Sequence, residues 1–203
     1  MKGFWDERYS GKEFVYGEIP NEYLKGKLTG LHQGKILFPA EGEGRNAVFA
    51  AKLGWTVSAF DQSETGKEKA QLLAQKNGVT IDYIVSEAKN ISYAENSFDA
   101  LALIYAHFHP EKRKVYHQKL SSYLKKGGIL ILEAFGKKHT ENQRNNPNAG
   151  GPKDVAMLYS VKEIKDDFDG FEIIEANEKE KELSEGKHHL GKANVAQMFA
   201  IKK

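Results

Sequence analysis

The sequence predicts one doubly wound α/β domain, and three observations support this prediction. Short apolar stretches alternate along the chain with segments of helical periodicity, the pattern of parallel strands joined by crossover helices. A strand, a glycine turn, a helix and a second strand follow one another between residues 35 and 63. The length of 203 residues suits a single domain. We expect residues 1–34 to form an N-terminal helical segment and residues 35–203 the core.

The strand–turn–helix–strand unit is the centre of the predicted fold. Residues 36–38 are an apolar run typical of a buried parallel strand, and the tight turn 41–44 follows. The next apolar residues recur every three to four positions and predict a helix that ends at Gly54. A second strand over residues 56–60 then leads directly to Asp61.

This unit predicts a site for a ribose-containing ligand. Glycines let the backbone approach a bound molecule, and free N–H groups at the start of the helix offer polar contacts. Asp61, at the tip of the second strand, is placed to accept hydrogen bonds from both ribose hydroxyls. Residues 42–47, GEGRNA, also satisfy G-x-G-x-x-G/A, so the pattern allows a dinucleotide. Without a ligand, the same residues are a glycine turn with a capping aspartate.

The rest of the chain continues the alternation. We expect loops over the polar segment 136–154 and over most of the charged segment 177–194. A capping box, SVKE, opens a short helix at Ser160. The remaining predicted helices span residues 64–75 and 110–124, and the remaining strands span residues 80–85, 98–105, 129–132, 171–176 and 195–201.

The segment before the first strand is rich in aromatic side chains. Trp5, Arg8 and Tyr9 fall on one face of a helix. One interpretation is an amphipathic helix that packs on the sheet. The other is a lid, in which Trp5 or Tyr16 lies against the ligand and Arg8 reaches an anionic group. A lid must also pack, so both interpretations stay open.

Composition narrows the classes of function. The 30 basic and 28 acidic residues are dispersed and leave no basic block for nucleic acid. The chain has no cysteine, which excludes disulfides, cysteine metal sites and a cysteine nucleophile. No apolar run approaches the ~20 residues of a membrane helix, and no apolar signal core follows the first residue. We expect a cytoplasmic protein, a monomer or weak homodimer, whose partner is a small molecule rather than nucleic acid or a membrane.

Three separated motifs resemble the class I S-adenosylmethionine-dependent methyltransferases: the glycine turn with Asp61, the strand SFDALALI, and LKKGGILI. Within that superfamily, WDERYSG, PAEGEGRNA and EGKHHLGKANVAQ resemble the bacterial branch related to tellurite-resistance and thiopurine methyltransferases. The resemblance implies a three-layer, Rossmann-like, mostly parallel seven-stranded sheet with an antiparallel last strand. It also implies S-adenosylmethionine as cofactor.

The resemblance assigns roles to individual positions. The turn faces the methionine part of the cofactor, Asp61 holds the ribose, and backbone around Ile104 lies near the ammonium group. Together with the aromatic segment, the predicted cofactor contacts are Trp5, Arg8, Tyr16, Ala40, Glu41, Gly42, Gly44, Asn46, Asp61, Gln62, Ser63, Glu87, Ala88, Ile104 and Ala106.

The sequence departs from the family pattern at two positions of the first motif. Phe38 stands where the first strand commonly carries an acid, and Ala40 stands where the first glycine is common. Alanine narrows the allowed backbone angles. We hypothesise that Glu41 replaces the missing acid in recognising the ammonium group. The alternative is that Glu41 and Glu43 only favour the helix N-terminus electrostatically.

Methyl transfer to an acceptor needs mainly positioning and exclusion of water, and a general base only if the acceptor arrives protonated. The candidate bases are His107, after the fourth strand, and His189, with Glu185 nearby; a purely structural role is the alternative for both. His107 and His109 lack a third ligand, so no metal is expected. We predict methyl transfer to a small molecule, such as a thiol, selenium or tellurium species. The alternatives are an NAD-dependent oxidoreductase and a non-catalytic S-adenosylmethionine-binding partner protein.

Overall fold

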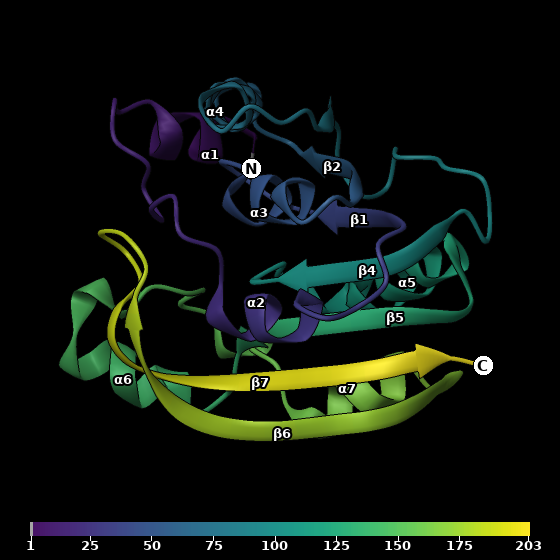
Figure 1. Ribbon diagram of the computed structural model, residues 1–203. Coiled ribbons are helices and arrows are strands. Elements are labelled where there is room, and N and C mark those ends of the chain that lie inside the picture. Colours follow the sequence, from purple (N-terminus) through teal and green to yellow (C-terminus); the bar gives the residue numbers. More distant parts are fainter. Residues whose placement is uncertain (1) are drawn as a thin grey trace.

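One mixed sheet organises the molecule, which the computed structural model describes for residues 2–203 (Figure 1). Its strands are ordered β3-β2-β1-β4-β5-β7-β6. The first five strands pair in parallel, and β7 runs antiparallel to both β5 and β6. The three-layer, mostly parallel, seven-stranded sheet with an antiparallel last strand is therefore confirmed.

The strands are β1 (Lys35–Pro39), β2 (Thr56–Asp61), β3 (Asp82–Val85), β4 (Phe98–Ile104), β5 (Leu124–Phe135), β6 (Phe171–Ser184) and β7 (Leu190–Lys202). The helices are α1 (Lys2–Tyr9), α2 (Glu22–Leu28), α3 (Arg45–Lys52), α4 (Glu64–Lys76), α5 (Pro110–Ser122), α6 (His139–Asn145) and α7 (Val161–Asp167). Short 3-10 turns span Pro147–Ala149 and Val155–Met157.

Strand β1 shows why the sheet has two cores. All residues of β1 after Lys35 are buried, and they alternate between the faces. Leu37 joins a cluster that includes Leu120 of α5 and Ile164 of α7. Ile36 and Phe38 instead join Leu24 of α2 and residues of α3. Helices therefore cover both faces, as in a doubly wound fold.

The predicted elements are present in the predicted order, but two loops were predicted wrongly. The charged segment 177–194 lies mostly in β6 and β7, which form a long antiparallel hairpin. The polar segment 136–154 contains α6 and a 3-10 turn. Helix α2 has only seven residues and gave no periodic signal.

The carboxyl ends of the parallel strands lie together on the left side of Figure 1. The N-terminal segment, α6 and the turn between β6 and β7 gather at this same end. Ligands of doubly wound folds bind at this edge. Among residues 2–203, no helix is long and apolar enough to cross a membrane.

Candidate active site

The glycine turn after β1 is held from both sides. The N–H of Gly42 donates to Asp61 Oδ2 at 3.2 Å, and the Tyr83 hydroxyl donates to the Gly42 carbonyl at 2.6 Å. Ala40 adopts φ 53°, the left-handed region that favours glycine. Strain of this kind persists where the surrounding structure fixes the backbone, commonly at functional sites.

Asp61 has the features of a ribose-binding carboxylate. It is buried at the end of β2, and its Oδ1 accepts the N–H of Ser63 at 2.9 Å. Burial raises its pKa to about 6, against the opposing effect of the backbone hydrogen bonds. Backbone groups of Ser63, Gly42 and Gln62 bond to this carboxylate, which leaves about one of its roughly four acceptor positions for a hydroxyl. These residues therefore fit a bound nucleoside.

Glu41 caps helix α3. Its Oε1 accepts the N–H groups of Asn46 and Ala47, both at 2.8 Å. Burial raises its pKa to about 7. Glu41 thus stabilises the N-terminus of α3 through two hydrogen bonds, as a negatively charged side chain at this position is expected to do. Phe38 lies in the core, so Glu41 is the acid adjoining Ala40 in the turn.

Helix α1 lies on the glycine turn. A Cβ built on Gly42 would lie 2.6 Å from the Tyr9 hydroxyl, so only glycine fits under this ring. Tyr9 stacks on Trp5 at 5.5 Å, and Ser63 Oγ donates to Asp6 at 2.6 Å. The N-terminal segment is therefore packed and covers the turn at the same time.

The segment after α1 is tied to the turn by Glu43. Its Oε2 accepts the N–H groups of Val15 at 2.8 Å and Tyr16 at 3.3 Å, and its Oε1 pairs with Lys69 at 2.8 Å. The hairpin between β6 and β7 closes the other side, because the N–H of Lys187 donates to the Val15 carbonyl at 3.0 Å. The N-terminal segment and the β6–β7 hairpin, which are distant in sequence, thus meet over the glycine turn.

A group of rings continues from the turn to the ends of β4 and β5. The His189 ring lies 4.5 Å from Tyr16, 4.7 Å from Tyr105 and 5.1 Å from Phe135. Tyr105 follows β4 directly and adopts φ 52°, a strained value for a residue other than glycine. Acceptors of doubly wound enzymes approach at this end of the sheet.

His189 and Glu185 form a carboxylate–histidine pair. His189 Nδ1 lies 3.2 Å from Glu185 Oε2, and Arg45 Nη2 lies 2.8 Å from the same oxygen. Burial opposes ionisation of Glu185, but bonds from His189 and Arg45 outweigh it and lower its pKa to about 2. Burial lowers the pKa of His189. A lowered pKa favours the uncharged ring, and Nδ1 is the ring nitrogen for which a hydrogen bond is found within residues 2–203.

His107 is placed differently. Its Nδ1 lies 2.9 Å from the Met157 carbonyl, and its Nε2 accepts the N–H of Phe135 at 3.3 Å. Burial lowers its pKa to about 4. Both ring nitrogens are engaged by backbone, so His107 has no free lone pair in this conformation. His109 is largely exposed at the N-terminus of α5.

Most of the residues predicted to contact the cofactor lie around the glycine turn. Ala88 and Ile104 are buried in the two cores, and Glu87 is exposed and pairs with Lys89 at 2.8 Å. The remaining predicted positions lie at the ends of β1, β2 and β4, at the start of α3 or in the covering segment: Trp5, Arg8, Tyr16, Ala40, Glu41, Gly42, Gly44, Asn46, Asp61, Gln62, Ser63 and Ala106.

Sequence reasoning missed the charged network behind the rings. Asn21, Arg45, Tyr105 and Glu133 were not among the predicted site residues, yet all contact the His189 region directly or through one partner. One signal was available, because Glu133 interrupts the apolar strand ILILEAF.

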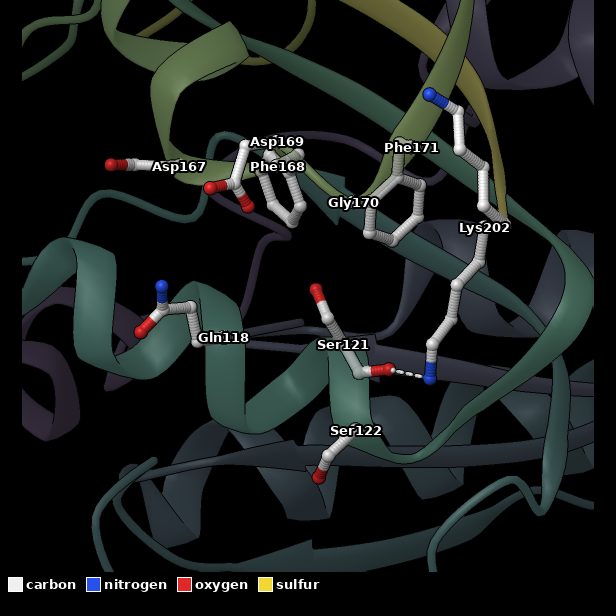
Figure 2. A pocket seen from close by; sticks show the side chains of 10 residues that line it. Gln118, Ser121, Ser122, Asp167, Phe168, Asp169, Gly170, Phe171 and Lys202 are labelled. Atoms are coloured by element: carbon white, nitrogen blue, oxygen red, sulfur yellow. Dashed lines mark hydrogen bonds between the residues drawn. The ribbon is translucent and has the colours of Figure 1, made fainter.

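Two hollows lie away from this site. The one in Figure 2, of about 300 Å³, is lined by residues of α5, the α7–β6 connection and the end of β7. Lys202 there donates to the Ser121 carbonyl at 2.8 Å. The other, of about 450 Å³, lies between α2 and β6. Neither includes the glycine turn or Asp61.

Comparison with known proteins shows what this part of the chain is similar to. Residues 39–132 match the family model of a methyltransferase domain. The uncharacterized methyltransferase YbaJ of Bacillus subtilis is 27% identical over 131 residues, which are 64% of this chain and 48% of YbaJ. The chain thus spans about half the length of this curated relative.

Solved structures share the fold. One, reported for the conversion of a disulfide bond into a thioacetal group during echinomycin biosynthesis, has a TM-score of 0.80 at 20% identity, covering 100% of this chain and 92% of that one. TehB from Haemophilus influenzae has a TM-score of 0.72 at 17% identity, covering 100% and 67%. A SAM-dependent methyltransferase from Methanosarcina mazei has a TM-score of 0.69 at 20% identity, covering 91% and 99%.

The matched segment runs from the end of β1 to β5 and contains the glycine turn, Asp61 and the end of β4. The acids and backbone groups there fit a nucleoside-containing cofactor. Within the matched residues 39–132 the chain is therefore similar to S-adenosylmethionine-dependent methyltransferases, and this similarity implies S-adenosylmethionine as the cofactor.

Proposed function

We propose that this protein transfers the methyl group to a small-molecule acceptor, and that His189 removes the acceptor's proton. The observation that carries the proposal is the Glu185–His189 pair, bonded through Nδ1 and set among the rings of Tyr16, Tyr105 and Phe135. Glu185 accepts from Nδ1 and so fixes the tautomer that leaves Nε2 as the base.

S-adenosylmethionine, when bound, would supply an activated methyl group, which the acceptor would attack in line with S-adenosylhomocysteine as the leaving group. The protein's own residues do the rest. Asp61 holds the ribose, and the α1 segment and the β6–β7 hairpin exclude water. The acceptor's proton passes to His189 Nε2 as the new bond to the methyl carbon forms, and Glu185 stabilises the resulting imidazolium.

The acceptor we propose is a thiol, with selenium and tellurium species as the second class. The motifs WDERYSG, PAEGEGRNA and EGKHHLGKANVAQ support this branch of the superfamily. A base discriminates between the classes, because a thiol arrives partly protonated and an oxyanion does not. Arg45 is already engaged by Glu185, and this favours the uncharged acceptor.

Methyl transfer from labelled S-adenosylmethionine to thiophenol, selenite and tellurite tests the proposal. We expect transfer to thiophenol that falls by about 10²-fold in His189→Gln at pH 6, the size typical of losing a general base. His109→Gln, an exposed histidine, is the matched control and should be unaffected. Equal rates of transfer to thiophenol in His189→Gln and in the unaltered protein would contradict the role of His189. Absence of transfer to all three, with cofactor bound, would contradict the acceptor classes.

A further inference from the structure

A carboxylate with no exposed surface interrupts the apolar centre of the sheet. Glu133 is 0% exposed on β5, in register with Ile104 of β4 and Gln197 of β7. Removing an ionised carboxylate from water is energetically costly, and a well-packed apolar residue at such a position often gives a protein that is at least as stable. Stability alone therefore does not explain an acid at this position.

Glu133 accepts hydrogen bonds from four side chains on four different parts of the chain. Its Oε1 accepts from Asn21 Nδ2 at 2.7 Å, Tyr105 hydroxyl at 2.8 Å and Lys181 Nζ at 3.2 Å. Its Oε2 accepts from the Gln197 amide. Lys181, on β6, supplies the opposite charge. The carboxylate is thus fully coordinated by donors.

Asn21 links this carboxylate to the Glu185–His189 pair. Its Nδ2 donates to Glu133 and also, at 3.2 Å, to Glu185 Oε1. Its Oδ1 caps α2 by accepting the N–H of Leu24 at 3.0 Å. Asn21 is 0% exposed, and its one amide therefore fixes the distance between the carboxylates of Glu133 and Glu185.

Both rings of the acceptor region depend on this network. Tyr105 has a strained backbone and is held through its hydroxyl by Glu133. His189 is held through Nδ1 by Glu185, and the two rings meet edge to face at 4.7 Å. Neither Asn21 nor Glu133 bonds to His189, so both act through other residues.

We propose that Glu133 and Asn21 are positioning residues for methyl transfer: they set the His189 and Tyr105 rings against each other at the acceptor site. The catalytic part of this assignment rests on the proposed function. The geometric part, that the rings lose their arrangement without the network, does not.

Two variants test the network. Glu133→Gln keeps the volume but places an amide donor against the donors of Gln197 or Lys181. Asn21→Ser keeps an oxygen that caps α2 and removes the bridging amide; it serves if Glu133→Gln fails to fold. Asp167→Asn is the matched control, because it breaks a buried ion pair with Arg113 and His117 on the α5–α7 side of the molecule.

The first measurement is NMR of the His189 ring, assigned with His189→Gln, together with the Kd of S-adenosylhomocysteine. We expect the ring signal and its pH titration to move in Glu133→Gln and Asn21→Ser and to stay in Asp167→Asn. The Kd should change less than twofold in all three. An unmoved ring signal in both network variants would overturn the proposal.

The second measurement is kcat with thiophenol, the acceptor for which the proposed base is needed. A loss on the order of 10²-fold is expected in both network variants, as for a displaced catalytic group. Equal kcat in all variants would overturn the catalytic part. If no acceptor turns over, the proposed function fails, and the NMR result still decides the geometric part.

Discussion

At the scale of single residues, the site contains carboxyl groups whose ionised form is disfavoured by burial. Burial raises the pKa of Asp61 to about 6 and of Glu41 to about 7. A carboxyl with a raised pKa contributes stability at low pH, and this contribution is lost as the pH rises through the raised value. A cofactor whose hydroxyls donate to Asp61 stabilises the ionised form that the empty site disfavours.

Binding of S-adenosylhomocysteine should therefore weaken in acid. If only ionised Asp61 binds the ribose, Kd at pH 5 should be about tenfold higher than at pH 8, because pH 5 lies one unit below its pKa. Calorimetry between pH 5 and 8 measures this. Asp61→Asn should bind weakly at every pH, and a wild-type Kd independent of pH would show that Asp61 does not control binding.

The residues differ in how far the sequence could predict them. Asp61 and Gly42 belong to a local unit whose spacing is visible along the chain, and the structure joins them by a hydrogen bond. Asn21 and Glu133 are 112 positions apart and meet only through tertiary packing, so no local pattern reveals their contact. The acid in ILILEAF was the one visible trace.

At the scale of elements, the strands at the site were predictable because apolar runs between turn residues are local signals. The hairpin of β6 and β7 was not, because alternating Glu and Lys residues look alike in an exposed edge strand and in a loop. Helix α1 was predicted as a face of aromatics, but only packing could show that Tyr9 seals Gly42.

Removing the Tyr9 ring should release α1. Burial of an aromatic side chain typically contributes about 3–5 kcal/mol against alanine, so Tyr9→Ala should lower the free energy of unfolding and expose residues 3–20 to protease. Limited proteolysis with and without S-adenosylhomocysteine measures the exposure. Phe4→Ala is the control, because Phe4 lies on the same helix and is 54% exposed as a residue. Equal cleavage of both variants would contradict the sealing role of Tyr9.

At the scale of the whole molecule, the sheet brings three parts of the chain to one edge. The N-terminal segment, the glycine turn and the β6–β7 hairpin are joined there by Glu43, Arg45 and Glu185. The mostly parallel seven-stranded sheet with an antiparallel last strand followed from the resemblance and is confirmed, whereas the joining contacts needed the structure. The central claim is that this edge binds S-adenosylmethionine at Asp61.

Calorimetric titration of the protein with S-adenosylmethionine, S-adenosylhomocysteine and NAD tests that claim most directly. We predict one-to-one binding of the first two ligands, lost in Asp61→Ala, and no binding of NAD. Binding of NAD alone, or binding of S-adenosylmethionine that survives Asp61→Ala unchanged, would contradict it.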